Sequence, residues 1–133
     1  MAEPYPGPQR REILLVDDSP IVIKAISRVL RRDHDVTAAG NGQEALDLIR
    51  SGRTFDAIVC DVAMPNLSGI DLYKVLVKEH PALARRFMFA TGGAETLRGI
   101  TYLIATDVPV LLKPFTASAL REALDGLLGR ERS

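Results

Sequence analysis

Short apolar runs alternate with longer amphipathic stretches along this chain. The apolar runs lie at residues 13–16, 36–39, 57–60, 87–90 and 110–112. Because nearly all residues within each run are apolar or small, the runs are typical of strands that are buried on both faces of a parallel sheet. The pattern therefore predicts five buried strands.

Between these runs, apolar residues recur at the spacing of an α-helix. The first helix is predicted to begin at Ser19 and Pro20 and to extend to about Arg32, because serine caps helix N-termini and proline is tolerated in the first turn. The residues that mark the later helices are Ala45, Leu46 and Ile49, then Leu72, Tyr73, Leu76 and Val77, and finally Leu120, Leu124, Leu127 and Leu128. Residues 94–107 predict only a weak helix, because Gly99 and several β-branched residues interrupt it.

Strands that alternate with helices predict an α/β fold, in which a doubly wound parallel sheet carries helices on both faces. For five such units with right-handed crossovers, we expect the flavodoxin-like strand order 2-1-3-4-5. Residues 12–129 form the predicted domain. Residues 1–11, rich in proline and glycine, predict a flexible leader, and residues 130–133 predict a short tail.

Composition narrows the class of protein. The chain has 133 residues, and its 17 Lys and Arg balance its 17 Asp and Glu, so no basic field indicates direct binding of nucleic acid or an anionic membrane. No apolar run approaches the roughly 20 residues of a spanning helix. The single cysteine, Cys60, suits a reducing compartment. We therefore predict a cytoplasmic protein without membrane insertion.

Polar side chains follow the carboxyl ends of four of the five predicted strands. Asp17 and Asp18 follow the first strand, Asp61 the third, Thr91 the fourth and Lys113 the fifth. In a doubly wound sheet these ends share one edge, and ligands bind in the crevice there. The sequence therefore predicts one site that contains three carboxylates, a hydroxyl and an ammonium group.

Such a site is suited to phosphoryl transfer onto an aspartate. Three close carboxylates raise one another's pKa unless a cation joins them. Mg²⁺ accepts one or two carboxylates and keeps waters that phosphate oxygens can replace. Aspartate can act as a covalent nucleophile, and positive charge around the phosphoryl group is the main help that a protein gives this reaction.

Each of these residues taken alone also has a structural explanation. Asp17 and Asp18 could complement the dipole of the following helix, and Asp61 could form a turn. Thr91 and Lys113 could lie in plain solvated loops. The structural explanations do not account for the joint placement of these residues at successive strand ends.

Three further residues are expected to have no chemical role. Cys60 lies in an apolar run, which is typical of a buried core thiol. His34 and His80 have no cysteine or acid at ligand spacing, so we expect surface positions for both rather than metal binding.

Four blocks of the sequence match the signature blocks of bacterial response-regulator receiver domains. They are Leu14-Leu15-Val16-Asp17-Asp18-Ser19, Asp61-Val62-Ala63-Met64-Pro65 with Gly69, Thr91-Gly92, and Lys113-Pro114-Phe115. The resemblance covers roughly residues 12–128, and the four blocks in this order are far more specific than any one of them.

The resemblance implies an acceptor and a metal site. Asp61 would accept a phosphoryl group from the phosphohistidine of a histidine kinase or a histidine phosphotransfer protein. Asp18 and Asp61 would bind Mg²⁺ directly, Asp17 mostly through a water, and the backbone carbonyl of Ala63 would be a further ligand.

The resemblance also implies a switch. Lys113 would contact the phosphoryl group, aided by a cis peptide bond to Pro114, and Thr91 would turn its hydroxyl toward the group after phosphorylation. Our own hypothesis, based on Gly92, Gly93 and Gly99, is that residues 92–108 then shift and change the binding of a downstream protein, which the sequence does not identify.

Two departures from the family pattern concern this switch. Many receivers carry Tyr or Phe three residues before the lysine, where this chain has Val110, and residues 104–109 replace a usual Gly-Ala stretch. Thr91-Gly92-Gly93 and the poor helix that follows are similar to receivers attached to hybrid sensor kinases.

Two alternatives come from other classes. A Mg²⁺-dependent aspartyl-phosphate hydrolase of the haloacid-dehalogenase type needs a second acid two residues after its nucleophile, whereas Ala63 and Ser19 occupy those positions after Asp61 and Asp17. An unphosphorylated pseudo-receiver would usually have lost an acid or the lysine, and this chain retains them. We therefore predict a phosphorylated signalling domain that is not an enzyme.

Overall fold

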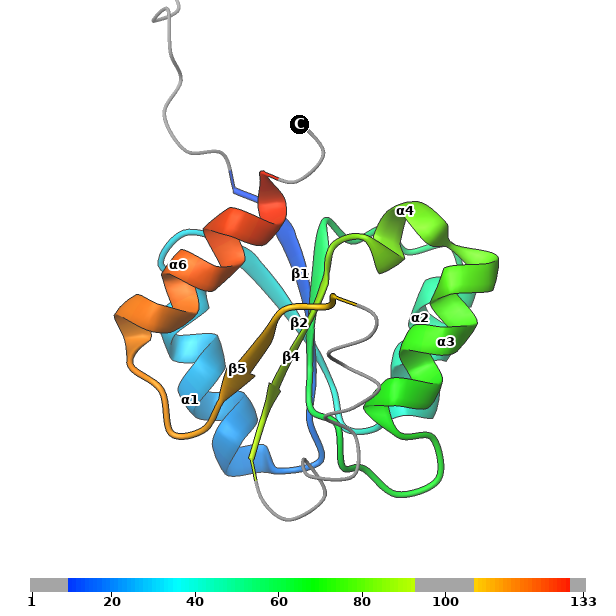
Figure 1. Cartoon of the computed structure of the whole chain (residues 1–133), viewed down its shortest axis with the longest axis horizontal. Helices are drawn as coiled ribbons and strands as arrows, with labels where there is room; N and C mark the ends of the chain where they lie inside the picture. The colour runs from blue at the N-terminus through cyan, green and yellow to red at the C-terminus, as the bar shows by residue number, and fades with distance from the viewer. Residues whose placement is uncertain (1–9, 93–106, 130–133) are drawn as a thin grey trace, which may run out of the picture.

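The computed structural model describes residues 10–92 and 107–129 of the chain, and these residues form a three-layer α/β fold (Figure 1). The strands are β1 (Glu12–Val16), β2 (Asp35–Ala39), β3 (Ala57–Cys60), β4 (Phe87–Thr91) and β5 (Val110–Leu112). All four strand pairings are parallel, and the order across the sheet is β2-β1-β3-β4-β5. The predicted fold class and strand order are confirmed.

Helices cover both faces of the sheet. The described helices are α1 (Pro20–Leu30), α2 (Gly42–Arg50), α3 (Gly69–Glu79), α4 (Pro81–Ala84) and α6 (Ala117–Leu128). Figure 1 shows α1 and α6 on one side of the sheet, and α2 and α3 on the other. The short α4 was not predicted, and His80 both ends α3 and precedes α4. The weak helix predicted at residues 94–107 lies almost wholly outside the described residues.

The four longer helices begin at polar side chains that cap their free backbone N–H groups. The capping residues are Ser19, Asn41, Ser68 and Thr116. At Ser68 the cap is reciprocal, because the side chain of Asp71 accepts a hydrogen bond from the backbone N–H of Ser68 in turn. The predicted start of the first helix at Ser19 and Pro20 is confirmed.

The core consists of two hydrophobic layers, one on each side of the sheet. Alternate residues of a strand point to opposite faces, so Ile13 and Leu15 pack toward α1 and α6, whereas Leu14 and Val16 pack toward α2 and α3. All four side chains are at most 1% exposed. The continuous apolar run thus fills both layers and holds β1 rigidly beneath the residues that follow it.

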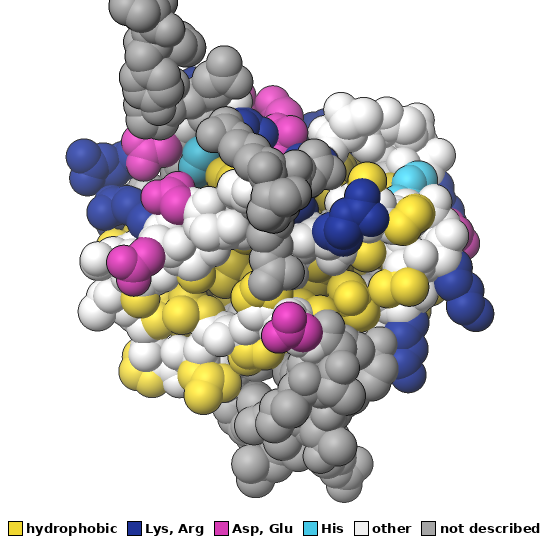
Figure 2. All heavy atoms as spheres, turned by 45° about the horizontal axis from the view of Figure 1, so that its top comes forward, with side chains coloured by type: hydrophobic (Ala, Val, Ile, Leu, Met, Phe, Trp, Pro, Cys, Tyr) yellow, Lys and Arg dark blue, Asp and Glu magenta, His cyan; other side chains and the backbone are white. Residues whose placement is uncertain are grey.

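The prediction that all five strands are buried is wrong for β2 and β5. In β2 only Ala39 is buried. Val110 is 38% exposed and Leu112 is 54% exposed, whereas Leu111 packs into the layer beneath α1 and α6. The reason is that β2 and β5 are the two edge strands of the sheet. Figure 2 shows hydrophobic side chains across the middle of the face that it draws.

The apolar stripe predicted on α3 is narrower than expected. Leu72 and Leu76 are fully buried, and Tyr73 packs edge-on against the rings of Phe87 and Phe89 at centroid distances of 5.3 and 6.4 Å. Val77, which the helical spacing placed with these residues on one side of the helix, is 47% exposed and does not share their buried position. At 100° per residue, Val77 is rotated away from the row that Leu72 and Leu76 form.

His34 is buried rather than on the surface, because the chain before β1 packs against it. Its side chain is 7% exposed, and its Nδ1 accepts a hydrogen bond from the backbone N–H of Arg11 over 3.3 Å. Arg10 donates to the backbone carbonyl of His34 over 2.8 Å and pairs with Asp35 at 3.1 Å. The flexible leader remains a prediction, since residues 1–9 lie outside the described residues.

The expectation that Cys60 is a buried core thiol is confirmed, because this residue is fully buried. Phe115 packs partly buried against the layer of α1 and α6. None of the helices that the structure describes is both long enough and apolar enough to cross a lipid bilayer.

Candidate functional site

The parallel register of the sheet brings the predicted polar residues to one edge. Val16 pairs with Cys60 across β1 and β3, so Asp17 and Asp61, the next residues of each strand, emerge side by side. One carboxylate oxygen from each of Asp17, Asp18 and Asp61 lies within 4.8 Å of the other two. The clustering of three carboxylates predicted from the sequence is thus present.

Both carboxylate oxygens of Asp17 have hydrogen-bond partners. The backbone N–H of Ser19 donates to Oδ1 over 2.9 Å, and the ammonium of Lys113 lies 2.9 Å from Oδ2. The Asp17 side chain is 2% exposed, and a buried carboxylate needs such partners to remain charged. Asp18 points outward and is exposed, so the two adjacent acids differ sharply in their access to solvent.

Asp61 is nearly buried, and its two oxygens differ. Oδ1 accepts hydrogen bonds from the hydroxyl of Thr91 over 2.7 Å and from the backbone N–H of Val62 over 2.9 Å. The ammonium of Lys113 lies 4.0 Å from the same oxygen. No described residue donates a hydrogen bond to Oδ2, which leaves this oxygen available for a ligand or for chemistry.

The environment shifts the titration of Asp61 and Cys60. Burial raises the pKa of Asp61 above its usual value, and the negative charge of Asp17 acts in the same direction. The hydrogen bond from Thr91 and the charge of Lys113 oppose this rise. Burial raises the pKa of the Cys60 thiol well above normal, with a smaller contribution from the two aspartates, so this thiol stays protonated beside the site.

Lys113 reaches the site from the end of β5. Its backbone N–H donates to the carbonyl of Thr91 over 2.8 Å, which continues the pairing of β4 and β5 by one residue. The peptide bond between Lys113 and Pro114 is cis, as the resemblance implied. The ammonium of Lys113 lies 2.9 Å from Asp17 and 4.0 Å from Asp61, so it is closer to Asp17.

Gly69 allows the N-terminus of α3 to approach the site. A Cβ atom built on Gly69 would overlap the backbone carbonyl of Asp61. The backbone N–H of Gly69 donates to the carbonyl of Val62 over 2.9 Å, which ties the loop after Asp61 back onto itself. The sequence marked Gly69 only as part of a motif, and the structure supplies the steric reason for it.

The donor set fits a small hard cation. The cluster consists of carboxylate oxygens without a histidine or thiolate, which is the ligand type that Mg²⁺ prefers. Asp18 and Asp61 each present an oxygen that no described side chain occupies, whereas both oxygens of Asp17 are engaged. Ala63 is half-buried in the loop between Asp61 and Gly69.

Sequence reasoning missed two features of this site. The backbone N–H groups of Ser19 and Val62 orient the carboxylates of Asp17 and Asp61, and such groups carry no sequence signal. The structure also reveals a groove beside the acids, between α1 and β2, that begins at Asp17 and Asp18. A signal for the groove existed in Ser27, a polar residue on the inner side of an otherwise apolar helix face.

Comparisons with known proteins agree with this geometry. Residues 13–125 match the family model of the response regulator receiver domain. A probable transcriptional regulatory protein of Mycobacterium tuberculosis, TcrX, is 33% identical over 119 residues, which are 89% of this chain and 50% of that protein. A chemotaxis protein CheY homolog of Campylobacter jejuni is 31% identical over 120 residues, which are 89% of this chain and 92% of that protein.

A solved structure shows the same fold. The crystal structure of a response regulator receiver domain protein from Clostridium thermocellum superimposes with a TM-score of 0.79 at 27% identity, and covers 91% of this chain and 96% of that one. The similarity therefore extends over nearly all of that receiver domain, whereas the chain spans only half the length of the first curated relative.

Proposed function

The chain belongs to the response regulator receiver domain family, and we propose that Asp61 is its phosphoacceptor. The observation that carries the proposal is the surroundings of this carboxylate. Two further aspartates supply oxygens within 4.8 Å, and the ammonium of Lys113 lies 4.0 Å away. Such a site combines a nucleophile with the charges that phosphoryl transfer needs.

The nucleophile of the proposed reaction is Oδ2 of Asp61, the oxygen that accepts no hydrogen bond from a described residue. Oδ2 attacks the phosphorus atom of a phosphohistidine on a histidine kinase or a histidine phosphotransfer protein. An O–P bond forms, the P–N bond breaks, and its electron pair returns to the imidazole of the donor. Oδ1 stays hydrogen-bonded to Val62 during this step, which keeps the carboxylate oriented.

Asp18 and Asp61 would hold Mg²⁺ directly, with the backbone carbonyl of Ala63 as a further ligand. Asp17 would act mostly through a water, because both of its oxygens already have partners. A bound Mg²⁺ supplies positive charge that offsets the repulsion between the carboxylates and the incoming phosphoryl oxygens.

Thr91 and Lys113 would respond to the phosphoryl group. The hydroxyl of Thr91 already faces Asp61, so it would exchange Oδ1 for a phosphoryl oxygen and need not swing in from solvent. Lys113 would move its ammonium from Asp17 toward the new charge. Transmission of this change beyond β5 remains a prediction, since residues 93–106 lie outside the described residues and Val110 replaces the usual aromatic residue.

The phosphorylated domain would control a downstream protein in the cytoplasm. The identity of that protein, the similarity to receivers of hybrid sensor kinases and the lack of an enzymatic activity all stay predictions. The hydrolase alternative is disfavoured by the residues two positions after each candidate nucleophile. Ala63, two residues after Asp61, carries no acid. Ser19, two residues after Asp17, carries none either, and its backbone N–H donates to the Asp17 carboxylate.

The test is the intact mass of the protein after incubation with acetyl phosphate, with and without Mg²⁺. We expect a Mg²⁺-dependent gain of one phosphoryl group in the wild type and no gain in Asp61→Asn. Asp47→Asn, which changes an exposed acid on α2, is the matched control and should react like the wild type. A gain that persists in Asp61→Asn would disprove the assignment. No gain with acetyl phosphate, phosphoramidate or a phosphorylated phosphotransfer protein would favour the pseudo-receiver.

A further inference from the structure

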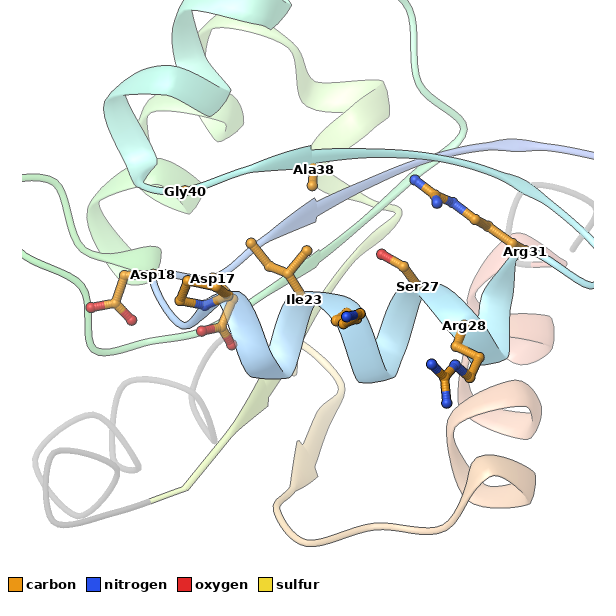
Figure 3. Close-up of a pocket in the computed structure, with 10 residues that line it drawn as sticks. Asp17, Asp18, Ile23, Ser27, Arg28, Arg31, Ala38 and Gly40 are labelled. Atoms are coloured by element: carbon orange, nitrogen blue, oxygen red, sulfur yellow. The ribbon is translucent and has the colours of Figure 1, made fainter.

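A groove separates α1 from β2 and opens beside the acidic site. It encloses about 570 Å³, which is within the size range of small-molecule sites. Figure 3 shows that it runs along α1 from Asp17 and Asp18, past Ile23 and Ser27, to Arg31. Ala38 of β2 forms the opposite wall. No part of the proposed phosphoryl transfer uses the end of the groove at Arg31.

The hydroxyl of Ser27 is the most unusual feature of the groove. Ser27 is only 6% exposed, and among the described residues its Oγ has no hydrogen-bond partner. Figure 3 shows the side chain pointing from α1 toward the wall at Ala38. Buried polar groups are nearly always paired, so a buried hydroxyl without a partner in the described residues requires an explanation. The hydroxyl therefore indicates a ligand that brings an acceptor.

Positive charge surrounds this hydroxyl. Lys24 and Arg31 lie three residues before and four residues after Ser27 along α1, so these three residues share one side of the helix. Arg28 directly follows Ser27, and all three cations line the groove. Within residues 10–92 and 107–129, none of the three cations makes a side-chain hydrogen bond or ion pair. Figure 3 shows the side chain of Arg31 extending back along the groove toward Ala38, whereas Arg28 points away from β2.

The cations alone would carry no conclusion, because positive charge near a helix C-terminus also complements the helix dipole. The buried hydroxyl is the independent observation that points to an acceptor between them. A phosphate ester suits this arrangement better than a single carboxylate, because it offers oxygens to the hydroxyl and to a guanidinium fork at once. Ile23 and Ala38 form an apolar wall for the organic part of such a ligand.

We propose that the groove between α1 and β2 binds a phosphate monoester of a small organic molecule, with the phosphate on Ser27 and Arg31 and the organic part along Ile23 and Ala38. The site differs from the one at Asp61. Without Mg²⁺, the three carboxylates repel an anion, whereas the end of the groove at Ser27 and Arg31 attracts it. Binding therefore requires neither Mg²⁺ nor a reaction at Asp61, and the two proposals fail or hold separately.

The test is a titration of the ¹⁵N-labelled chain in Mg²⁺-free buffer with EDTA, followed by amide chemical shifts. Phenyl phosphate is the probe, phenol lacks the anion, and benzoate carries a carboxylate in place of the phosphate. We expect saturable shifts with phenyl phosphate that gather on residues 23–31 and Ala38, and weaker effects from the other two compounds. Absence of saturable shifts would overturn the proposal, and tighter binding of benzoate would overturn the assignment of a phosphate.

Three variants localise the contact. Ser27→Ala and Arg31→Gln should each weaken binding of phenyl phosphate by about tenfold or more, because each removes a hydrogen bond to a charged group. Arg32→Gln changes a neighbouring exposed arginine that does not line the groove, and it should bind like the wild type. Alanine is favourable in a helix, so Ser27→Ala should fold. Equal losses in Arg31→Gln and Arg32→Gln would indicate diffuse attraction and overturn the proposed site.

Discussion

The hydroxyl of Thr91 donates a hydrogen bond to the carboxylate of Asp61, with 2.7 Å between Oγ1 and Oδ1. Thr91 is fully buried at the end of β4, so this bond is shielded from water. It stabilises the charged form of Asp61 in surroundings that otherwise favour the neutral acid. The same hydroxyl is the group that we propose to meet the phosphoryl group, and its resting partner is the acceptor itself.

Thr91→Val tests this relationship, because valine keeps the shape of threonine and removes the donor. We expect the free energy of unfolding at pH 7 to fall by about 1–3 kcal/mol, since a hydrogen bond to a charged group is lost inside the protein. The pKa of Asp61 should rise further. Urea denaturation and carboxyl ¹³C shifts measure the two effects. Thr91→Ser, which retains a hydroxyl, is the control, and equal stability of the valine variant and the wild type would contradict the prediction.

Mg²⁺ should stabilise the folded chain through Asp18. Asp18 is the exposed member of the three acids, so Asp18→Asn removes a ligand with little disturbance of the core. For the wild type we expect about 2.7 kcal/mol of added stability when free Mg²⁺ is 100 times its Kd. Thermal unfolding with and without Mg²⁺ measures it. Asp18→Asn should lose most of this gain and Glu122→Gln, an exposed acid on α6, should keep it; the opposite pattern would exclude Asp18 as a ligand.

His34 should make the protein less stable in mild acid. Burial lowers the pKa of His34 below its usual 6.5, an effect that nearby Arg10 and Arg11 reinforce and Asp33 and Asp125 oppose. The unfolded chain therefore takes up a proton at a higher pH than the folded chain does. The stability that His34 contributes is complete above pH 6.5 and is lost as the pH falls from there through the lowered pKa of the folded state.

This loss can be assigned by substitution. We expect urea denaturation from pH 7.5 down to pH 5 to show a decline that is smaller in His34→Gln. His80→Gln replaces the other histidine of the chain and should retain the decline of the wild type. If both variants declined alike, the effect would belong to carboxylates and not to His34.

Ser27→Ala should raise the stability of the free protein. The substitution removes a buried hydroxyl that lacks a partner among the described residues and places a better helix former inside α1. We expect about 1–2 kcal/mol in the free energy of unfolding, measured by urea denaturation without added anions. Ser51→Ala, at an exposed hydroxyl that donates to Leu48, should give no such increase. A loss of stability in Ser27→Ala would mean that the hydroxyl is already satisfied.

The sequence by itself determined the sheet and the place of the chemistry. Runs such as Ile13 to Val16 are apolar at every position, and only a strand buried on both faces accommodates that. Polar residues that directly follow such strands must gather at one edge of a parallel sheet. For this reason Asp17, Asp61 and Lys113 could be placed together before the structure was known.

Only the tertiary structure decided the features that depend on neighbours distant in sequence. His34 is buried because Arg10 and Arg11 pack over it, and β2 and β5 are partly exposed because they lie at the two edges of the sheet. The distinction between the two oxygens of Asp61 likewise arises from the packing of separate elements. So does the position of the Ser27 hydroxyl facing β2, where no described residue pairs with it. A local pattern records which face a residue takes, whereas its partners are set by how the elements assemble.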